Sequence, residues 1–181
     1  MLPLITLDML RKLKACAPAL AAFEKKFGQS TTPKMLVEEL QKMSPRCGWD
    51  VWLIRQDPEL ADTMLASGVN IHAMEDFALR AESLYGNTVL MKIYLKYGAD
   101  VHARDNEAIQ NAVALGRTGA VDLLETHGAD VRVGNDSLVR LAEKNGRTEI
   151  VEILRRREKR TREVPREFFS EIVPPEEYLF A

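Results

Sequence analysis

The residues best suited to metal binding or catalysis, histidine and cysteine, are few and widely spaced in this chain. There are three histidines and two cysteines among 181 residues. His72 and His102 are thirty residues apart, a spacing that would place them on neighbouring packed helices, whose axes lie about 8–10 Å apart. A zinc ligand lies only about 2.0–2.1 Å from the metal. Because no further ligand residue accompanies the pair, no metal site is predicted.

Catalytic motifs are equally scarce. The chain contains neither a glycine-rich phosphate-binding loop nor a Gly-x-Ser-x-Gly nucleophile motif. A pair of Cys47 with His72 is compatible with the sequence, but no motif favours it. We therefore predict a protein that is not an enzyme and that uses no cofactor. An activity in the N-terminal helical region is the alternative.

The amino-acid composition excludes several classes of protein function. Hydrophobic residues make up 46% of the chain and charged residues 29%, and the formal net charge is −2. The chain as a whole is thus no polycation for coating nucleic acid or an anionic membrane. No apolar run approaches the roughly 18–20 residues of a membrane span, and two cysteines do not form a disulfide framework. These features predict a cytoplasmic protein, in its own cell or in a host's, without a membrane partner.

Three consecutive segments of thirty residues align without a gap, at 68–97, 98–127 and 128–157. Each has a glycine at its start and another in its middle, where a helix can end in a left-handed residue. A threonine follows two residues after the middle glycine, and we expect its hydroxyl to cap the second helix. An Asp or Asn column is expected to cap the first helix. These four columns are Gly68, Gly98 and Gly128; Gly86, Gly116 and Gly146; Thr88, Thr118 and Thr148; and Asp76, Asn106 and Asp136.

Apolar residues recur in the same frame. They predict one buried face on each of two helices per segment. Such a unit cannot bury its apolar face alone, so stacking of neighbours is expected. The main columns are Leu79, Ile109 and Val139 on the first helix, and Leu90, Ala120 and Ile150 on the second.

This pattern resembles the ankyrin repeat. The resemblance is carried by Gly-Ala-Asp-Val at 98–101 and 128–131, and by the helix endings at 121–124 and 150–154. The repeat is shorter than the usual period of about 33 residues, and the Thr-Pro-Leu-His opening is absent. It is similar to the short variant common in large DNA viruses and in some phage and bacterial proteins. The resemblance implies an all-α, ankyrin-type helical repeat solenoid with an N-terminal helical cap, a C-terminal tail and a shortened finger.

The predicted organisation has four parts. Residues 1–47 form an N-terminal helical region with helices at 7–14, 18–27 and 33–43, and residues 48–67 form a degenerate capping repeat. The three repeats occupy 68–157. Residues 158–181 form a basic and aromatic tail, in which a short helix is expected at 166–172. Asp57 and Pro58 are expected to begin the second helix of the degenerate repeat.

An ankyrin array binds partners through its loop tips and the exposed ends of its first helices, so the resemblance implies the same here. These columns differ between the three repeats, as a specific surface requires. Met74, Phe77, Leu84, Tyr85 and Leu115 predict an apolar and aromatic patch, and the sequence leaves open whether the N-terminal helices or the tail cover it. The candidate partner-binding residues are Met74, Phe77, Leu84, Tyr85, Arg104, Asp105, Glu107, Leu115, Asn135 and Lys144.

The resemblance therefore implies a protein–protein interaction module, and the viral character of the short repeat suggests a phage or viral accessory protein that inhibits or redirects a host factor. Nucleic-acid binding is the alternative, through 155–162 with its six positive and one negative side chains. That stretch ends a predicted helix, where the helix dipole favours Arg and Lys anyway. Self-association through the tail is a further expectation.

Overall fold

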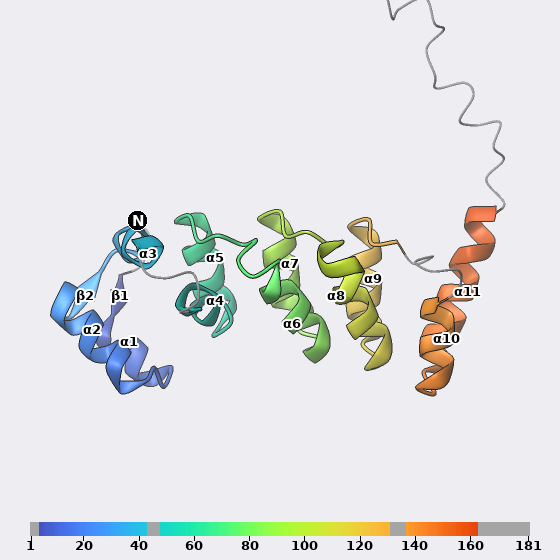
Figure 1. Cartoon of the computed structure of the whole chain (residues 1–181), viewed down its shortest axis with the longest axis horizontal. Helices are drawn as coiled ribbons and strands as arrows, with labels where there is room; N and C mark the ends of the chain where they lie inside the picture. The colour runs from blue at the N-terminus through green and yellow to red at the C-terminus, as the bar shows by residue number, and fades with distance from the viewer. Residues whose placement is uncertain (1–3, 43–47, 131–136, 163–181) are drawn as a thin grey trace, which may run out of the picture.

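The structure is a computed structural model that describes residues 4–42, 48–130 and 137–162 (Figure 1). It is mostly helical, and the helices pack in sequence order along one row. None of the helices in these ranges is both long and apolar enough to cross a membrane. The predictions for Cys47, Asn135, Asp136 and the helix at 166–172 lie outside the described residues.

Within the described ranges, β-strands occur only in the N-terminal part. Strand β1 (Ile5–Thr6) pairs antiparallel with β2 (Ser30–Thr31), with Ile5 opposite Thr31. This short pairing was not predicted, although the chain is mostly helical, as expected. Ile5, Thr6 and Thr31 are β-branched and therefore favour extended backbone, and the buried Ile5 side chain joins the hydrophobic core.

The three predicted N-terminal helices are present. They are α1 (Leu7–Lys12), α2 (Ala17–Phe27) and α3 (Pro33–Lys42). The Thr6 hydroxyl caps α1 by accepting a hydrogen bond from the Met9 amide at 3.1 Å. Thr32 does the same for α3 through the Met35 amide at 3.3 Å, followed by a proline in the first helical position, where its missing N–H costs nothing.

Eight further helices follow as four pairs. They are α4 (Trp49–Ile54) and α5 (Pro58–Ala66), α6 (Phe77–Tyr85) and α7 (Thr88–Lys96), α8 (Ala103–Ala114) and α9 (Thr118–Thr126), and α10 (Ser137–Lys144) and α11 (Thr148–Arg162). The two helices of each pair contact each other. The first helices α4, α6, α8 and α10 also contact one another in succession, as do the second helices α5, α7 and α9. Helix α3 packs against α4 and α5 at one end of this series.

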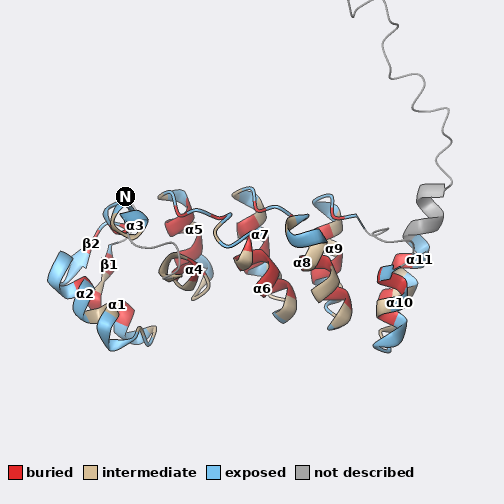
Figure 2. Cartoon of the chain, in the orientation of Figure 1, coloured by how far each residue is buried: buried red, intermediate tan, exposed pale blue. Residues whose placement is uncertain are grey.

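The core runs through the row between the helices (Figure 2). All six residues of the two main apolar columns are buried, which confirms their predicted orientation. The middle glycines adopt positive φ, as expected, with 74° at Gly86, 72° at Gly116 and 65° at Gly146. Asp57 accepts a hydrogen bond from the Leu60 amide at 2.8 Å, so its predicted role as the cap of α5 is confirmed.

The caps predicted at Thr88, Thr118, Asp76 and Asn106 are wrong. Thr88 and Thr118 are the first residues of their helices rather than the caps, and α7 is capped by the Asn87 side chain, which accepts from the Leu90 amide. Asp76 directly precedes α6 but makes no capping bond. Asn106 ends the non-helical turn near the start of α8, and its side chain contacts His102 instead. A capping side chain needs an extended backbone, whereas Asp76 and Asn106 have φ of 55° and 65°.

Candidate partner-binding surface

Two left-handed turns form the loop tips that the sequence predicts. Met74, Glu75 and Asp76 have φ of 55°, 58° and 55°, and the residues thirty positions later, 104–106, have φ of 51°, 57° and 65°. None of these residues is a glycine, so each conformation costs on the order of 1–3 kcal/mol and must be held by its surroundings. The two tips therefore depend on specific contacts from neighbouring side chains.

Arg80, on α6, supplies those contacts for the first tip. Its guanidinium donates to the carbonyl oxygens of Glu75 at 2.8 Å and Met74 at 2.9 Å. Thirty residues later, Gln110 on α8 donates to the Asp105 carbonyl at 2.7 Å. Arg80 is buried, with a relative exposure of 6%, so these hydrogen bonds are shielded from solvent.

Asp76 links the first tip to the next part of the chain. Its Oδ1 accepts a hydrogen bond from the Asp100 amide at 2.9 Å and lies 3.0 Å from Nδ1 of His72. His102 and Asn106 make the corresponding contact at 2.7 Å. The two histidines are thus engaged by separate turns. Across the described ranges, no three His, Cys, Asp or Glu side chains converge as metal ligands would.

A ladder of ion pairs crosses the first helices. Arg55, which ends α4, pairs with Glu82 on α6 at 2.8 Å, and Arg80 on α6 pairs with Glu107 on α8 at 2.7 Å. Arg104 approaches Glu107 at 3.4 Å and Glu75 at 3.5 Å. Ion pairs therefore connect the first helices α4, α6 and α8, and Arg104 lies between the carboxylates of Glu75 and Glu107.

Phe77 and Tyr85 lie against this ladder. The Phe77 ring has the guanidinium of Arg55 at 5.6 Å from its centroid and that of Arg80 at 5.7 Å. The Tyr85 ring has Arg55 at 5.8 Å. Cation–π contacts at such distances stabilise by roughly 0.5–2 kcal/mol and hold both partners in place. Arg55 thus lies between two aromatic rings that are eight residues apart on α6.

The buried Tyr94 side chain positions the end of α4 through a hydrogen bond. Its hydroxyl donates to the Ile54 carbonyl at 2.9 Å, and the side chain is fully buried. Burial raises the pKa of the Tyr94 phenol, and the negative charge of Glu82 raises it further, whereas Arg55 lowers it. The neutral hydroxyl therefore holds the carbonyl of the residue just before Arg55.

The structure brings together five of the ten predicted residues, and their shared neighbours are Arg55, Arg80 and Glu75. Tyr85 and Met74 are 65% and 54% exposed, whereas Phe77 is half-buried. The α1–α3 helices leave Tyr85 and Met74 exposed. The five residues are Met74, Phe77, Tyr85, Arg104 and Glu107.

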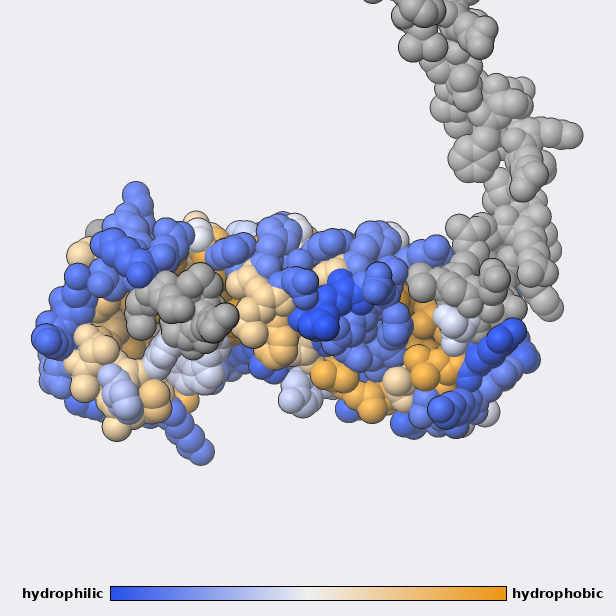
Figure 3. Space-filling model, in the orientation of Figure 1, coloured by the Kyte–Doolittle hydropathy of each residue, from blue (hydrophilic) through white to orange (hydrophobic). Residues whose placement is uncertain are grey.

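The other predicted residues lie apart from the ion pairs of Arg55 and Arg80. Leu84 is half-buried, and its carbonyl accepts from Arg117 at 2.9 Å. Leu115, 41% exposed, follows α8 thirty residues after Tyr85. Asp105 and Lys144 are exposed on the second tip and at the end of α10, and Asn135 lies outside the described residues. In Figure 3, hydrophobic patches interrupt a largely hydrophilic face, several of them toward its lower edge.

Sequence reasoning missed Arg55, Arg80 and Glu82, which organise the surface. The sequence contained a signal, because Arg80 and Glu82 are two charged residues in a predicted helix, 77–85, that is otherwise mostly apolar. Charged side chains are rarely buried unless they are paired. Two charges in a helix that is predicted to be largely buried could therefore have indicated ion pairs with neighbouring helices. No protein-family model matches the chain, and no curated protein matches it significantly.

Proposed function

We propose that the chain is an ankyrin-type helical solenoid that binds another protein through the surface around Phe77 and Tyr85. Support for the solenoid comes from hydrogen bonds that recur at thirty-residue spacing. The amides of Val69, Ala99 and Ala129 donate to the carbonyls of Met64, Tyr94 and Leu124. In the same way, the guanidinium Nε of Arg117 donates to the Leu84 carbonyl and that of Arg147 to the Ala114 carbonyl.

The observation that carries the binding proposal is an exposed aromatic ring beside an ordered guanidinium. Tyr85 is 65% exposed, yet it has Arg55 against its ring, and Arg55 is itself held by Glu82. A rigid aromatic side chain loses little conformational entropy on binding. Tyr and Arg are also the residue types enriched at the centres of protein interfaces. The arrangement is therefore suited to burying an apolar or aromatic side chain of a partner against Tyr85.

Proteins are favoured over nucleic acid as the partner class. The basic stretch 155–162 forms the end of α11, and Arg155 at its start is paired with Glu143 of α10. Nucleic-acid affinity depends on several cations free to contact phosphates, and Arg155, one of the six, is already paired with a carboxylate at the protein surface. The resemblance to short viral and phage repeats supports a host factor as the partner, and this part of the proposal rests on the resemblance alone.

The proposal is tested by affinity purification with the Phe77→Ala/Tyr85→Ala variant. Wild-type protein and variant are used as bait in lysate of the native cell, and retained proteins are quantified by mass spectrometry. A Met35→Ala/Val89→Ala variant is the matched control, because both residues are exposed and lie on α3 and α7. We expect one stoichiometric partner that the control retains and the Phe77/Tyr85 variant loses. Equal recovery by the two variants would reject this surface.

A further inference from the structure

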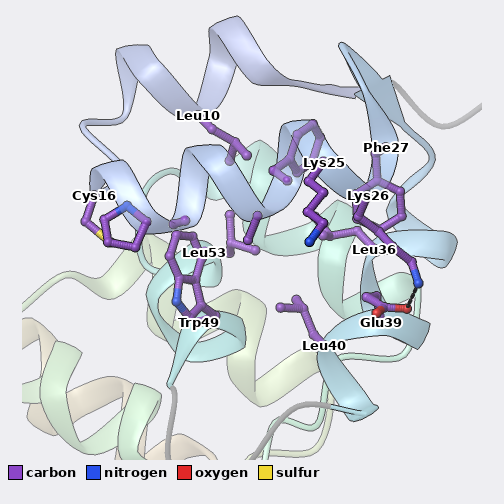
Figure 4. A pocket seen from close by; sticks show the side chains of 14 residues that line it. Leu10, Cys16, Lys25, Lys26, Phe27, Leu36, Glu39, Leu40, Trp49 and Leu53 are labelled. Atoms are coloured by element: carbon purple, nitrogen blue, oxygen red, sulfur yellow. Dashed lines mark ion pairs between the residues drawn. The ribbon is translucent and has the colours of Figure 1, made fainter.

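A hollow lies in the N-terminal part, away from the Tyr85 surface. It has a volume of about 580 Å³ and is walled by α1, α2, α3 and α4 (Figure 4). Its floor is made of the buried side chains of Leu10, Phe23, Leu36 and Leu53. Phe27, Leu40 and Trp49, all half-buried, also line it. An open apolar hollow between helices is the geometry that accepts apolar side chains of a peptide segment.

The polar rim of this hollow is basic. Lys26 is paired with Glu39 at 3.1 Å, and Glu39 is also contacted by Lys42 at 3.3 Å. Lys25 points into the hollow in Figure 4, and within 4–42, 48–130 and 137–162 it has no carboxylate partner. Residues 4–42 carry seven Lys or Arg against four Asp or Glu, a net charge of +3. An occupant should therefore combine apolar side chains with negative charge.

The chain itself contains one such segment. Residues 163–181 hold five Glu and one Arg, a net charge of −4. Interspersed with these charges are the apolar residues Phe168, Phe169, Ile172, Val173, Tyr178, Leu179 and Phe180. Acidic and apolar residues thus alternate within nineteen residues, and this composition complements an apolar hollow lined by Lys25.

The arrangement of the helices favours a second molecule as the source of this segment. Helix α11 lies at the opposite end of the row from α2 and α3 (Figure 1). Four steps between packed helix pairs, each about 10 Å, separate them by roughly 40 Å. Nineteen residues reach at most about 60 Å when fully extended. A segment from the same molecule would use about two thirds of its reach on the path and leave few residues to dock.

We propose that residues 163–181 of one copy dock in the α1–α4 hollow of a second copy, with glutamates of the segment against Lys25. Such a contact joins two different surfaces, so it produces head-to-tail assembly in rings or open chains. It does not depend on the Tyr85 surface. Both surfaces can be occupied at once, which would present several partner sites on one assembly.

The test measures binding of a fluorescein-labelled peptide of residues 163–181 to the full chain by fluorescence anisotropy. We expect saturable binding that Ala22→Trp abolishes, because Ala22 is exposed and lines the hollow. Ala21→Trp is the matched control, since Ala21 is exposed on the same helix without lining the hollow. Lys25→Glu should weaken binding by about 10-fold, equivalent to ~1.4 kcal/mol, and Lys34→Glu should leave it within about 2-fold.

Two further measurements examine the charge pairing and the self-association of the chain. A peptide with Glu176→Lys and Glu177→Lys should bind the Lys25→Glu protein better than it binds wild type. In sedimentation velocity, the full chain should associate as its concentration rises, and excess unlabelled peptide should dissociate it. The proposal is overturned if the peptide does not bind, if Ala22→Trp and Ala21→Trp behave alike, or if the chain stays monomeric. Circular dichroism confirms that each variant remains helical.

Discussion

The guanidinium of Arg80 lies 2.7 Å from the carboxylate of Glu107, and this ion pair joins α6 to α8 across the candidate surface. The Arg80 side chain is only 7% exposed, whereas that of Glu107 is 36% exposed. Because the same guanidinium also holds the carbonyls of the first left-handed tip, one side chain couples the packing of two helices to the shape of a loop.

Replacing Arg80 should therefore be costly. Arg80→Met leaves two carbonyl oxygens without their donor and Glu107 without its nearest cation, and we expect a loss of about 2–4 kcal/mol in the free energy of unfolding. Gln110→Met, thirty residues later, removes one exposed hydrogen bond and should cost at most about 1 kcal/mol. Urea unfolding followed by circular dichroism compares the two. Similar losses would show that Arg80 does not organise the tip.

Arg55 and Glu82 should be energetically coupled. Glu82 is 5% exposed, so Arg55→Gln leaves a buried carboxylate without its cation and should cost about 2–4 kcal/mol. The Arg55→Gln/Glu82→Gln double variant should recover part of this loss, with a coupling energy of about 1–3 kcal/mol in a double-mutant cycle. The exposed pair of Asp62 and Lys96, at 2.7 Å, is the control, and its coupling should be clearly smaller because water screens exposed charges. Equal couplings would contradict this assignment.

Tyr85→Ala should affect binding far more than folding. The side chain is 65% exposed, so its loss should lower the free energy of unfolding by at most about 1 kcal/mol, the value of an exposed cation–π contact. If it anchors the partner, affinity should fall by about 30-fold or more, the effect of a 2 kcal/mol hot spot. Isothermal titration calorimetry with the purified partner measures this, with Val89→Ala as the exposed control. A fall of less than about 3-fold would remove Tyr85 from the interface.

Tyr94 should make stability sensitive to alkaline pH. Burial raises its pKa in the folded chain above the ordinary value of 10.0. Its contribution is therefore fully present below about pH 10 and is lost as pH rises further, because the unfolded chain ionises first. Tyr94→Phe should cost about 1 kcal/mol at neutral pH through the hydrogen bond to Ile54. Above about pH 10 the wild type should lose stability faster than this variant in urea unfolding, and parallel curves would refute the assignment.

The helix boundaries were largely readable from the sequence. Asp57 caps α5, Thr32 caps α3, and the middle glycines end α6, α8 and α10. Each of these features acts through backbone groups within about four residues, so local sequence contains the necessary information. The apolar columns were readable for a similar reason, since burial on one face follows from helical periodicity.

The tertiary structure alone decided how the candidate surface is built. Asp76 was expected to cap its own helix, yet its carboxylate accepts from the Asp100 amide, 24 residues away. Arg55 and Glu82, and likewise Arg80 and Glu107, are separated by 27 residues. The pairing of β1 with β2 also joins distant segments. A carboxylate or guanidinium pairs with whichever opposite group packing brings within about 4 Å, and one sequence does not specify that distance until the helices are stacked.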